Sequence, residues 1–275
     1  MTSRRRLAVW GDPIAHSRSP QLHAAAYDVL GQDWEYGRRQ VTTDTFAAEL
    51  ASLDESWRGL SLTMPLKEVA YDAAGSLDQA ATLTGAVNTL LLGDAHLQGF
   101  NTDVGGIVDA FTHARVSSLG SVRILGAGAT ASSALVAVTA LGAHQVEVVA
   151  RRPDAAASLV RIGDELGIAV GIRSFSEAPT SVNATIATLP SGTVLDAPVA
   201  ARLRATGGVL FEAAYAPWPS ALAADWSAGT VISGLEMLLY QAVRQIRIFV
   251  HGDQERMLPD EDVMVSAMRL ALMGD

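Results

Sequence analysis

Cysteine is absent from the 275 residues of this sequence. Disulfide bonds, thiolate nucleophiles and cysteine-ligated zinc sites are therefore excluded, and the chain gains nothing from an oxidising compartment. Long apolar runs are also absent, so no segment is expected to span a membrane. The arginines at 4–6 lack the apolar run and cleavage site of a signal peptide, and we therefore expect a cytoplasmic protein.

Positive charge is scarce. The chain has 20 lysine and arginine residues against 29 aspartate and glutamate residues, and its formal net charge is −9. Binding along a nucleic acid needs a basic field, so a nucleic-acid partner is excluded, whereas a local pocket for one small anion is allowed. Aromatic residues make up only 6% of the chain. This aliphatic, alanine-rich composition favours α/β layers in one large or two modest domains.

Lysine is the scarcest basic residue, because Lys67 is the one lysine among the 20 basic residues. It lies in GLSLTMPLKEVA at 59–70. Arginine is never usefully deprotonated in a protein, whereas a lysine amine can be, so a proton-transfer site can use lysine where arginine would fail. Composition alone leaves two interpretations open: a proton donor, or a surface lysine in an arginine-rich chain.

Turn residues and apolar runs predict the elements of the first part of the chain. Strands are expected at 6–11, 34–41 and 59–63, and helices at 19–31, 42–53 and 103–114, with a further helix opened by Pro65 that carries Lys67 on its first turn. We expect Asp44 or a nearby threonine to cap the helix at 42–53. Residues 86–101 are expected to form a β-hairpin with a turn at Gly93 and Asp94.

The character of the sequence changes at residue 121. Residues 121–152 read as strand, glycine turn, alanine-rich helix and strand, which is a βαβ unit of about thirty residues. Strands are then expected at 184–189, 208–215 and 229–233, and helices at 153–167, 234–252 and 259–274. We place the domain boundary near residue 104, so that one domain is 1–103 completed by helices within 239–275 and the other is 104–238.

The segment ILGAGATASSA contains a G-x-G-x-x-A pattern at Gly126, Gly128 and Ala131, directly after an apolar strand. Such glycines permit the tight turn and a close backbone approach to a pyrophosphate, which then lies at the helix N-terminus. The next strand ends with Arg151 and Arg152, where NAD-binding units place an acidic residue. Two guanidinium groups there favour the 2′-phosphate of NADP. Alternatively, the sequence RRPD at 151–154 is simply the solvent-exposed start of the next helix.

Six short motifs occur along the chain in the order GDPIAHSRSPQLH, SLTMPLK, GAVNT, GFNTDVGG, EAAYAPWPSAL and GLEMLLYQA. On these motifs the chain resembles the shikimate dehydrogenase family over nearly its whole length. The resemblance implies a two-domain α/β fold, with an N-terminal mixed-sheet substrate domain and a Rossmann-type NADP-binding domain. It also implies reversible NADPH-dependent reduction of 3-dehydroshikimate to shikimate.

The resemblance further implies the residues of the site. Lys67 and Asp103 are expected to be catalytic. The expected substrate-binding residues are Ser17, Ser19, Thr63, Asn88, Asp103, Tyr215 and Gln241, with the two serines on the substrate carboxylate. The expected cofactor-binding residues are Gly126, Ala127, Gly128, Ala129, Thr130, Ala131, Arg151, Arg152, Leu189, Gly234 and Met237. No metal site is expected, because His16 and His23 lack an acidic partner at ligand spacing.

The chain departs from the family pattern at a few positions. Ser61 stands where the family usually has Asn, Ala24 where Asn often follows the histidine, and Glu212 where Asp is usual. On the cofactor side, Ala129 and Thr130 fill the end of the glycine turn, the Asn-Arg-Thr motif reads Ala150, Arg151, Arg152, and the Asn-Thr-Thr-Pro-x-Gly loop reads ATLPSG. These changes affect cofactor contacts more than the reaction.

Taken singly, the candidate residues also have structural interpretations. Ser17 and Ser19 can cap the following helix, Thr63 can end a strand, Asn88 can belong to a turn, Asp103 can be an N-cap, and Gln241 and Met237 can be helix surface and core. Rival functions are an NAD-dependent quinate/shikimate dehydrogenase and a non-catalytic shikimate-binding sensor. A folate-linked NADP enzyme is disfavoured by HSRSP and GFNTD. For the oligomeric state, a monomer and a homodimer are both compatible with the sequence.

Overall fold

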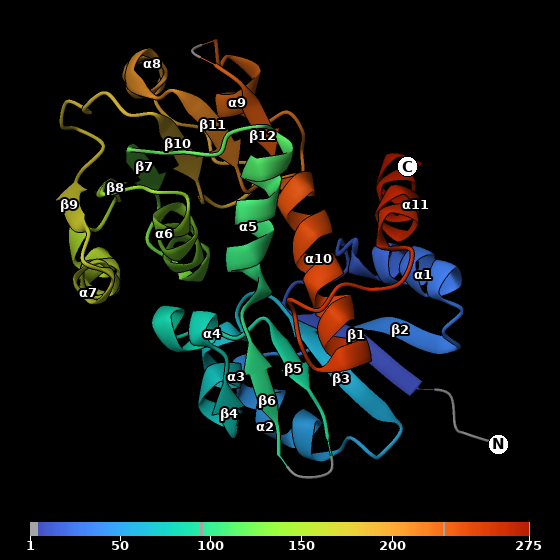
Figure 1. Ribbon diagram of the computed structural model, residues 1–275. Helices are drawn as coiled ribbons and strands as arrows, with labels where there is room; N and C mark the ends of the chain where they lie inside the picture. The colour runs from blue at the N-terminus through green and yellow to red at the C-terminus, as the bar shows by residue number, and fades with distance from the viewer. Residues whose placement is uncertain (1–4, 94–95, 228, 275) are drawn as a thin grey trace. The chain divides into compact units, whose positions relative to one another are not determined.

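The computed structural model describes residues 5–93, 96–227 and 229–274. The chain divides into two compact units, each with its own sheet. The first unit combines Met1–Thr102 with Leu238–Asp275, and the second unit is Asp103–Met237. The first unit is therefore built from two stretches that are separate in the sequence (Figure 1).

The first unit contains a six-stranded sheet in the order β2-β1-β3-β5-β6-β4. Its elements are β1 (Arg5–Gly11), α1 (Ser19–Leu30), β2 (Trp34–Gln40), α2 (Thr43–Ala51), β3 (Trp57–Leu62), α3 (Lys67–Ala73), β4 (Ser76–Leu77), α4 (Gln79–Thr84), β5 (Thr89–Leu91), β6 (Gln98–Phe100), α10 (Gly234–His251) from Leu238 onward, and α11 (Glu261–Met273). β1 pairs in parallel with β2 and β3, whereas β5 is antiparallel to both β3 and β6. The mixed sheet expected for this part of the chain is confirmed.

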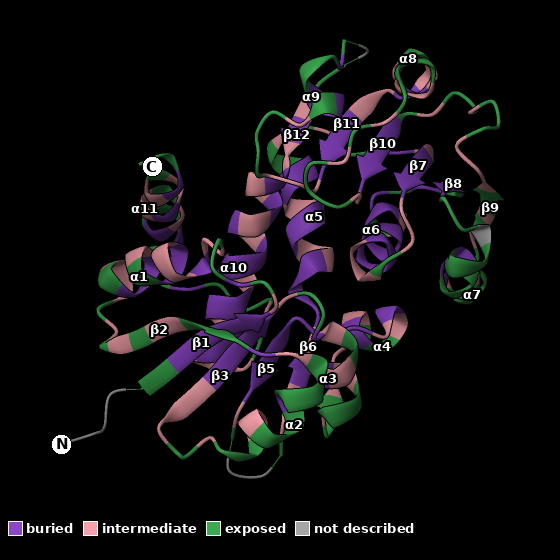
Figure 2. Ribbon diagram, turned by 180° about the vertical axis from the view of Figure 1, so that it is seen from behind, coloured by how far each residue is buried: buried purple, intermediate pink, exposed green. Residues whose placement is uncertain are grey.

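Alternation along β3 separates the two faces of this sheet. Phe46 of α2 and Ala70 of α3 pack in one buried cluster with Leu60 of β3. The next residue, Ser61, points to the other face, where its hydroxyl donates to the side-chain oxygen of Gln245 on α10 at 2.8 Å. The central strands of both sheets are largely buried, whereas the outer strands β2 and β9 are not (Figure 2). Burying a leucine side chain stabilises the folded state by about 1.5–3 kcal/mol relative to leaving it exposed. The helices packed on the two faces of the sheet therefore hold in place the sheet edge that carries the candidate site.

The second unit contains a six-stranded, fully parallel sheet in the order β12-β11-β10-β7-β8-β9. Its elements are α5 (Thr102–His113), β7 (Ser121–Leu125), α6 (Ala129–Ala140), β8 (Gln145–Val149), η1 (Pro153–Ala156), α7 (Ala157–Leu166), β9 (Ala169–Arg173), β10 (Ala184–Ala187), α8 (Ala197–Thr206), β11 (Val209–Glu212), α9 (Ala221–Ala224) and β12 (Val231–Ser233). This order is that of a doubly wound dinucleotide-binding sheet, so the Rossmann-type expectation is confirmed.

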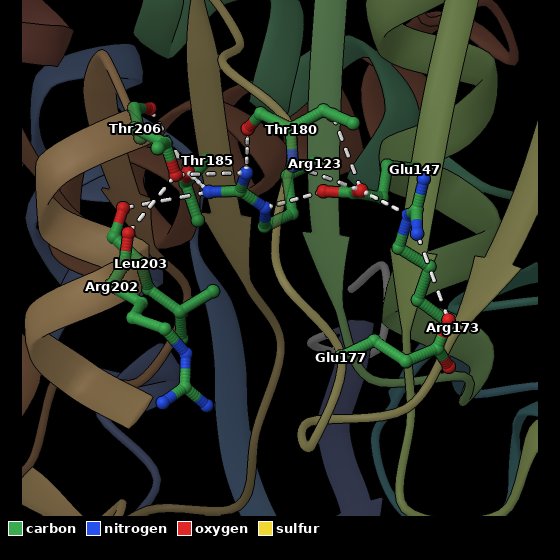
Figure 3. A network of polar contacts seen from close by, with 10 residues as sticks. Arg123, Glu147, Arg173, Glu177, Thr180, Thr185, Arg202, Leu203 and Thr206 are labelled. Carbon is green, nitrogen blue, oxygen red and sulfur yellow. Dashed lines mark hydrogen bonds and ion pairs between the residues drawn. The ribbon is translucent and has the colours of Figure 1, made fainter. Parts of the chain in front are cut away.

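A buried ion-pair network crosses the second sheet (Figure 3). Arg123 of β7 is 0% exposed and donates from Nε to Glu147 Oε2 at 2.7 Å. Glu147 Oε1 lies 2.7 Å from Arg173 Nε and accepts from the Thr180 amide at 3.3 Å. Arg123 also donates to the Thr180 carbonyl oxygen and to Thr206 Oγ1. Arg123 and Glu147 thus hold the segment after β9, which contains Thr180, and the end of α8 against the sheet, and removing either partner would leave a buried charge uncompensated.

Several elements differ from the sequence-based expectations. The helix expected to open at Pro65 begins at Lys67, and Pro65 lies in a turn after a cis Met64–Pro65 peptide. β11 ends at Glu212, three residues before the expected end of that strand at Tyr215. The hairpin formed by β5 and β6 is confirmed, but Asp94 of its expected turn lies outside the described residues.

Some elements were not expected from the sequence: β4, α4, β9, α8 and α9. The helix α2 follows Thr42, whose amide donates to Thr45 Oγ1 at 3.1 Å, so the expected threonine cap is confirmed. Within residues 5–93, 96–227 and 229–274, no helix combines the length and apolar character needed to cross a membrane.

Candidate active site

The candidate substrate residues of the first unit lie at one edge of its sheet. β1 and β3 are parallel and both end at this edge, and the antiparallel β5 begins there. β6 runs antiparallel to β5 and so ends at the same edge. Ser17 and Ser19 follow β1, Thr63 and Lys67 follow β3, and Asn88 precedes β5. The topology therefore brings together polar side chains that are far apart in the sequence, at the sheet edge where α/β proteins bind ligands.

Ser17 and Ser19 lie beside each other, with their hydroxyl oxygens 3.4 Å apart. Ser17 Oγ also accepts from the Ser19 amide at 3.4 Å. The N-cap position of α1 belongs to Arg18, whose side chain makes no capping bond. The helix-capping interpretation of the serines is therefore wrong for the N-cap position itself, and the Ser17 hydroxyl instead donates to the Ser19 hydroxyl.

Thr63 and Lys67 are placed by a tight turn after β3. The Thr63 amide donates to the Trp10 carbonyl at 3.0 Å, and the Thr63 carbonyl accepts from the Leu66 amide at 2.9 Å. Lys67 opens α3 and is half-buried. Its carbonyl accepts from the Val87 amide at 2.9 Å. This hydrogen bond therefore fixes the backbone of Lys67 beside Val87, the residue before Asn88.

Asn88 is a buried hub of this edge. Its Oδ1 accepts from the Thr102 amide at 2.9 Å, and its Nδ2 lies 3.5 Å from Gln241 Oε1. Its carbonyl accepts from the Leu62 amide at 2.7 Å, and its amide donates to the Phe100 carbonyl at 3.0 Å. Asn88 is therefore more than a turn residue, because it joins β3, β6, the start of α5 and α10.

Two further structural interpretations are wrong. Gln241 is buried rather than on the helix surface. Asp103 is buried and lies within the first turn of α5, which begins at Thr102, so it does not occupy the N-cap position. Thr102 Oγ1 lies 2.9 Å from Asn88 Nδ2, so the residue before Asp103 is held twice by Asn88.

A second polar cluster, here called the Gln245 network, consists of His23, Tyr27, Tyr36, Ser61 and Gln245. Gln245 Oε1 accepts from Ser61 at 2.8 Å and lies 3.3 Å from His23 Nε2. Tyr36 donates to Ser61 Oγ at 2.7 Å and stacks on His23 with ring centroids 3.8 Å apart. The Tyr27 hydroxyl lies 3.0 Å from His23 Nδ1. Both ring nitrogens of this buried histidine therefore have neutral partners.

Burial sets the charge state of His23. Removal of the ring from water lowers the pKa of His23 to about 3, and the hydrogen bond to Gln245 opposes that shift. Burial also raises the pKa of Tyr36 and of Tyr27 above their usual range. Near neutral pH the aromatic members of the network are therefore uncharged, and their hydrogen bonds are those of neutral groups.

The Gln245 network adjoins the expected site but was not found from the sequence. Gln245 Nε2 donates to the Asn88 carbonyl at 3.3 Å, and Tyr36 also hydrogen-bonds Ser19. A signal does exist, because Gln245 lies four residues after Gln241 and His23 four residues after Ser19. Polar residues repeated at i and i+4 on a mostly apolar helix face lie side by side and indicate a buried polar cluster.

In the second unit, the glycine turn lies at the point where the strand order reverses. Gly126 follows β7 with φ +114°, a conformation that favours glycine, and a Cβ there would lie 2.5 Å from Thr188 Oγ1 after β10. Gly128 is the N-cap of α6 and offers no side-chain cap. Ala127 lies between the two glycines, Ala129 and Thr130 open the helix, and Ala131 is buried. This geometry fits a pyrophosphate at a helix N-terminus.

The remaining cofactor candidates flank this turn or follow on later elements. Arg151 and Arg152 are exposed just beyond β8, whose last residue Val149 accepts from the Gly126 amide at 3.0 Å. Leu189 follows β10 and packs against the buried cluster that contains Leu125. The sheet therefore brings both arginines and Leu189 to the carboxyl edge that holds the glycine turn.

Gly234 and Met237 lie in the first turn of α10. A Cβ on Gly234 would lie 2.2 Å from the Ala213 carbonyl oxygen, so this close approach requires glycine. Met237 is buried. Tyr215 is half-buried in the segment between β11 and α9, close in sequence to Glu212, whose Oε2 accepts from the Ser220 hydroxyl at 2.8 Å.

In the described part of the chain, no group of three or more His, Asp or Glu side chains is placed to hold a metal ion. His16 is exposed, and His23 belongs to the Gln245 network.

Comparison with known proteins identifies relatives over the whole chain. A sequence model of the shikimate dehydrogenase substrate-binding domain matches residues 9–90. A shikimate dehydrogenase (NADP(+)) of Methanothermobacter thermautotrophicus is 32% identical and covers 97% of this chain and 96% of that protein. A counterpart from Thermus thermophilus is 33% identical and covers 97% of this chain and 98% of that protein.

Solved structures give the same result. The crystal structure of Mycobacterium tuberculosis shikimate dehydrogenase has a TM-score of 0.85 and 35% identity, covering 97% of this chain and 99% of that chain. A Thermus thermophilus enzyme, solved in complex with NADP(H) and shikimate, has a TM-score of 0.79 and 28% identity, covering 97% of this chain and 99% of that chain. These likenesses confirm the fold class expected from the motifs.

Proposed function

We propose, because the chain belongs to the shikimate dehydrogenase family, that it catalyses the reversible NADPH-dependent reduction of 3-dehydroshikimate to shikimate. The observation that carries the proposal is the sheet edge of the first unit. There the backbone of Lys67 and that of the residue before Asp103 are tied to the consecutive residues Val87 and Asn88. A proton donor and a carboxylate are thus carried by rigid elements, as precise chemistry requires.

Lys67 is the proton donor in this proposal. Bound NADPH supplies the hydride that converts the substrate carbonyl carbon to an alkoxide carbon. The alkoxide oxygen needs a proton, which the Lys67 ammonium group donates during reduction and the amine takes back during oxidation. Asp103 orients the ammonium group and accepts a hydrogen bond from a substrate hydroxyl. Arginine could hold the same charge but could not complete the proton transfer.

The substrate is held by neutral side chains with fixed positions. Shikimate carries a carboxylate and several hydroxyls, which call for a few convergent donors and acceptors. We assign these contacts to Ser17, Ser19, Thr63, Asn88, Tyr215 and Gln241. Support comes from the pairing of the two serines and from the buried bonds of Asn88, because side chains already held by the fold lose little freedom on binding.

NADP is the cofactor that the second unit fits. Gly126, Ala127 and Gly128 leave the backbone open to a pyrophosphate, and Ala129, Thr130 and Ala131 form the helix start that faces it. Arg151 and Arg152 bind the 2′-phosphate in this proposal. Leu189, Gly234 and Met237 complete the cofactor contacts. The domain 104–238 is therefore the cofactor domain, and 1–103 with 239–275 is the substrate domain.

Absorbance at the nicotinamide band tests the function directly. Purified protein is mixed with shikimate or quinate and with NADP or NAD. Fast reduction of NADP with shikimate, and little with NAD or quinate, is the expected result. Turnover mainly with NAD or quinate would move the protein to the quinate/shikimate branch. Shikimate binding without turnover under any pairing would identify a sensor and remove the catalytic role of Lys67.

The oligomeric state and the cellular location are also proposals. A monomer or homodimer is expected, and light scattering on the purified protein distinguishes them. A cytoplasmic location is proposed from the cysteine-free sequence, and fractionation of cells that express the protein checks it.

A further inference from the structure

The short helix α4, which sequence patterns did not predict, holds the segment that leads into the catalytic carboxylate. Asp78 is its N-cap and accepts from the Ala81 amide at 2.6 Å. The same oxygen accepts from the Asn101 amide at 3.3 Å, and the other carboxylate oxygen accepts from Gln254 at 2.8 Å. The Asp78 amide donates to the Gly99 carbonyl at 3.0 Å. One residue thus ties α4 to β6, to Asn101 and to the segment after α10.

The last residue of α4 holds Asn101 from the other end. Asn101 is 0% exposed, and its Nδ2 donates to Thr84 Oγ1 at 2.8 Å. The Thr84 hydroxyl in turn donates to the Ala80 carbonyl at 2.7 Å. The Thr84 proton is therefore committed, and only an acceptor faces Asn101. The side-chain amide of Asn101 is consequently oriented by α4.

Asn101 lies two residues before Asp103. α5 begins at Thr102, whose amide donates to Asn88 Oδ1 at 2.9 Å. Between the end of β6 and the first turn of α5, the backbone and side chain of Asn101 are thus held by the two ends of α4, and Thr102 is held by Asn88. The start of α5, and hence the place of Asp103 in its first turn, depends on these bonds.

Burial makes these contacts costly to lose. Burial raises the pKa of Asp78, and its hydrogen bonds from Ala81, Asn101 and Gln254 act against that shift. Losing the hydrogen bond from the buried Asn101 amide to Thr84 costs free energy and removes the contact that orients this side chain toward α4.

We propose that Asn101 and Thr84 are positioning residues for Asp103, with α4 acting as a clip that fixes the start of α5. This inference rests on the proposed function, because it assumes that Asp103 acts in the reaction. Loss of the clip displaces Asp103 relative to the substrate, and small displacements of a catalytic group lower the rate strongly.

The test uses three threonine variants of the full-length protein. Thr84→Val keeps the shape and removes the hydroxyl, Thr84→Ser keeps the hydroxyl, and Thr82→Val is the matched control on the same helix. Thr82 is exposed, and its Oγ1 donates to the Asp78 carbonyl at 2.8 Å, within its own helix. Asn101→Asp is a fourth variant, because its carboxylate would face the acceptor side of the Thr84 hydroxyl.

We expect Thr84→Val to lower kcat/KM for shikimate by about tenfold, as the loss of one positioning hydrogen bond allows, with KM for NADP within about twofold of the wild type. Thr84→Ser should restore at least half of the activity, and Thr82→Val should match the wild type. Asn101→Asp should lose at least as much activity as Thr84→Val.

Three results would overturn the inference: wild-type kcat/KM in both Thr84→Val and Asn101→Asp, equal losses in Thr84→Val and Thr82→Val, or a parallel rise in KM for NADP. Melting temperatures of all variants separate this effect from general destabilisation. The wild-type assay separates the two proposals, because an inactive wild type removes the proposed function, whereas an active wild type with fully active Thr84→Val and Asn101→Asp variants removes only the clip.

Discussion

At the scale of single residues, Lys67 tests the proposed chemistry most directly. Lys67→Arg keeps the positive charge but cannot release a proton, so turnover should fall by about 10²- to 10⁴-fold, the usual contribution of general acid–base catalysis. Shikimate affinity should be largely kept. Turnover by absorbance and the dissociation constant by calorimetry check the two halves of this expectation. Near wild-type turnover would end the assignment of Lys67 as the proton donor.

The arginines after β8 test the cofactor preference. In a variant with Arg151→Ala and Arg152→Ala, KM for NADP should rise by at least about tenfold, because two charge-assisted contacts to the 2′-phosphate are lost. KM for NAD should stay within about twofold, since NAD lacks that phosphate. Arg161→Ala is the matched control, because Arg161 is exposed and pairs with Glu165 on its own helix. Equal losses with both cofactors would contradict the assignment.

Short sequence motifs predicted the candidate site residues. The residues that hold those side chains in place could not be predicted in the same way. Asn88 and Gln241 were expected as ligands, and their buried bonds were not. Tyr36, Gln245 and Asn101 were missed, because each acts through contacts with residues distant in the sequence. Only the i, i+4 spacing of Gln245 after Gln241 offered a local signal.

At the scale of elements, apolar patterns predicted the elements that bury a regular face and failed for those that are very short or largely exposed. The helix α10 and the strand β7 carry clear apolar patterns. β4 has two residues and α4 has six, too few for a period to emerge. The α8 helix has an arginine on either side of Leu203, and Leu203 is the one buried residue among its described side chains. β9 is largely exposed at the edge of its sheet, so it lacks an apolar run.

The segment 213–220, which carries Tyr215, gives an element-scale prediction. Glu212 holds both of its ends, because it accepts from Ser220 Oγ at 2.8 Å and from the Ala214 amide at 3.4 Å. Glu212→Ala should loosen the segment and raise KM for shikimate by about threefold to tenfold. Hydrogen exchange in 213–220 should increase as well.

Two comparisons complete this test. Glu212→Asp, which carries the residue usual in the family, should retain most of the affinity. Glu165→Ala is the matched control, because Glu165 is exposed on α7. An unchanged KM together with unchanged exchange in Glu212→Ala would show that the carboxylate does not organise this segment.

At the scale of the whole molecule, the buried His23 makes stability depend on pH. Its pKa is about 3 in the folded protein against an ordinary value of 6.5, so the unfolded chain binds more protons between these values. The contribution of the neutral, buried His23 to the free energy of unfolding is fully present above pH 6.5 and is lost as the pH falls toward 3. At pH 5 this group alone should lower the free energy of unfolding by about 2 kcal/mol relative to pH 7.

His23→Asn removes that titration. Its melting temperature should therefore change less between about pH 7.5 and pH 5 than that of the wild type, although the variant is less stable at both values. His16→Asn is the control, because it replaces an exposed histidine that lies outside the Gln245 network. Scanning calorimetry of the three proteins at both pH values measures the difference. Parallel pH dependence in the wild type and His23→Asn would contradict the role of His23.

The division of the chain has a consequence for its synthesis. Asp103–Met237 is continuous, whereas the first unit needs Leu238–Asp275 to be complete. A ribosome delivers the strands β1–β6 long before it delivers α10, which supplies Gln241 and Gln245 to the sheet edge. The second unit can thus form while the first still waits for its last two helices. Until α10 is made, the face of the nascent β1–β6 sheet that α10 will cover stays exposed to other chains. Aggregation is a risk in this interval, and a ribosome-associated chaperone would protect the chain then.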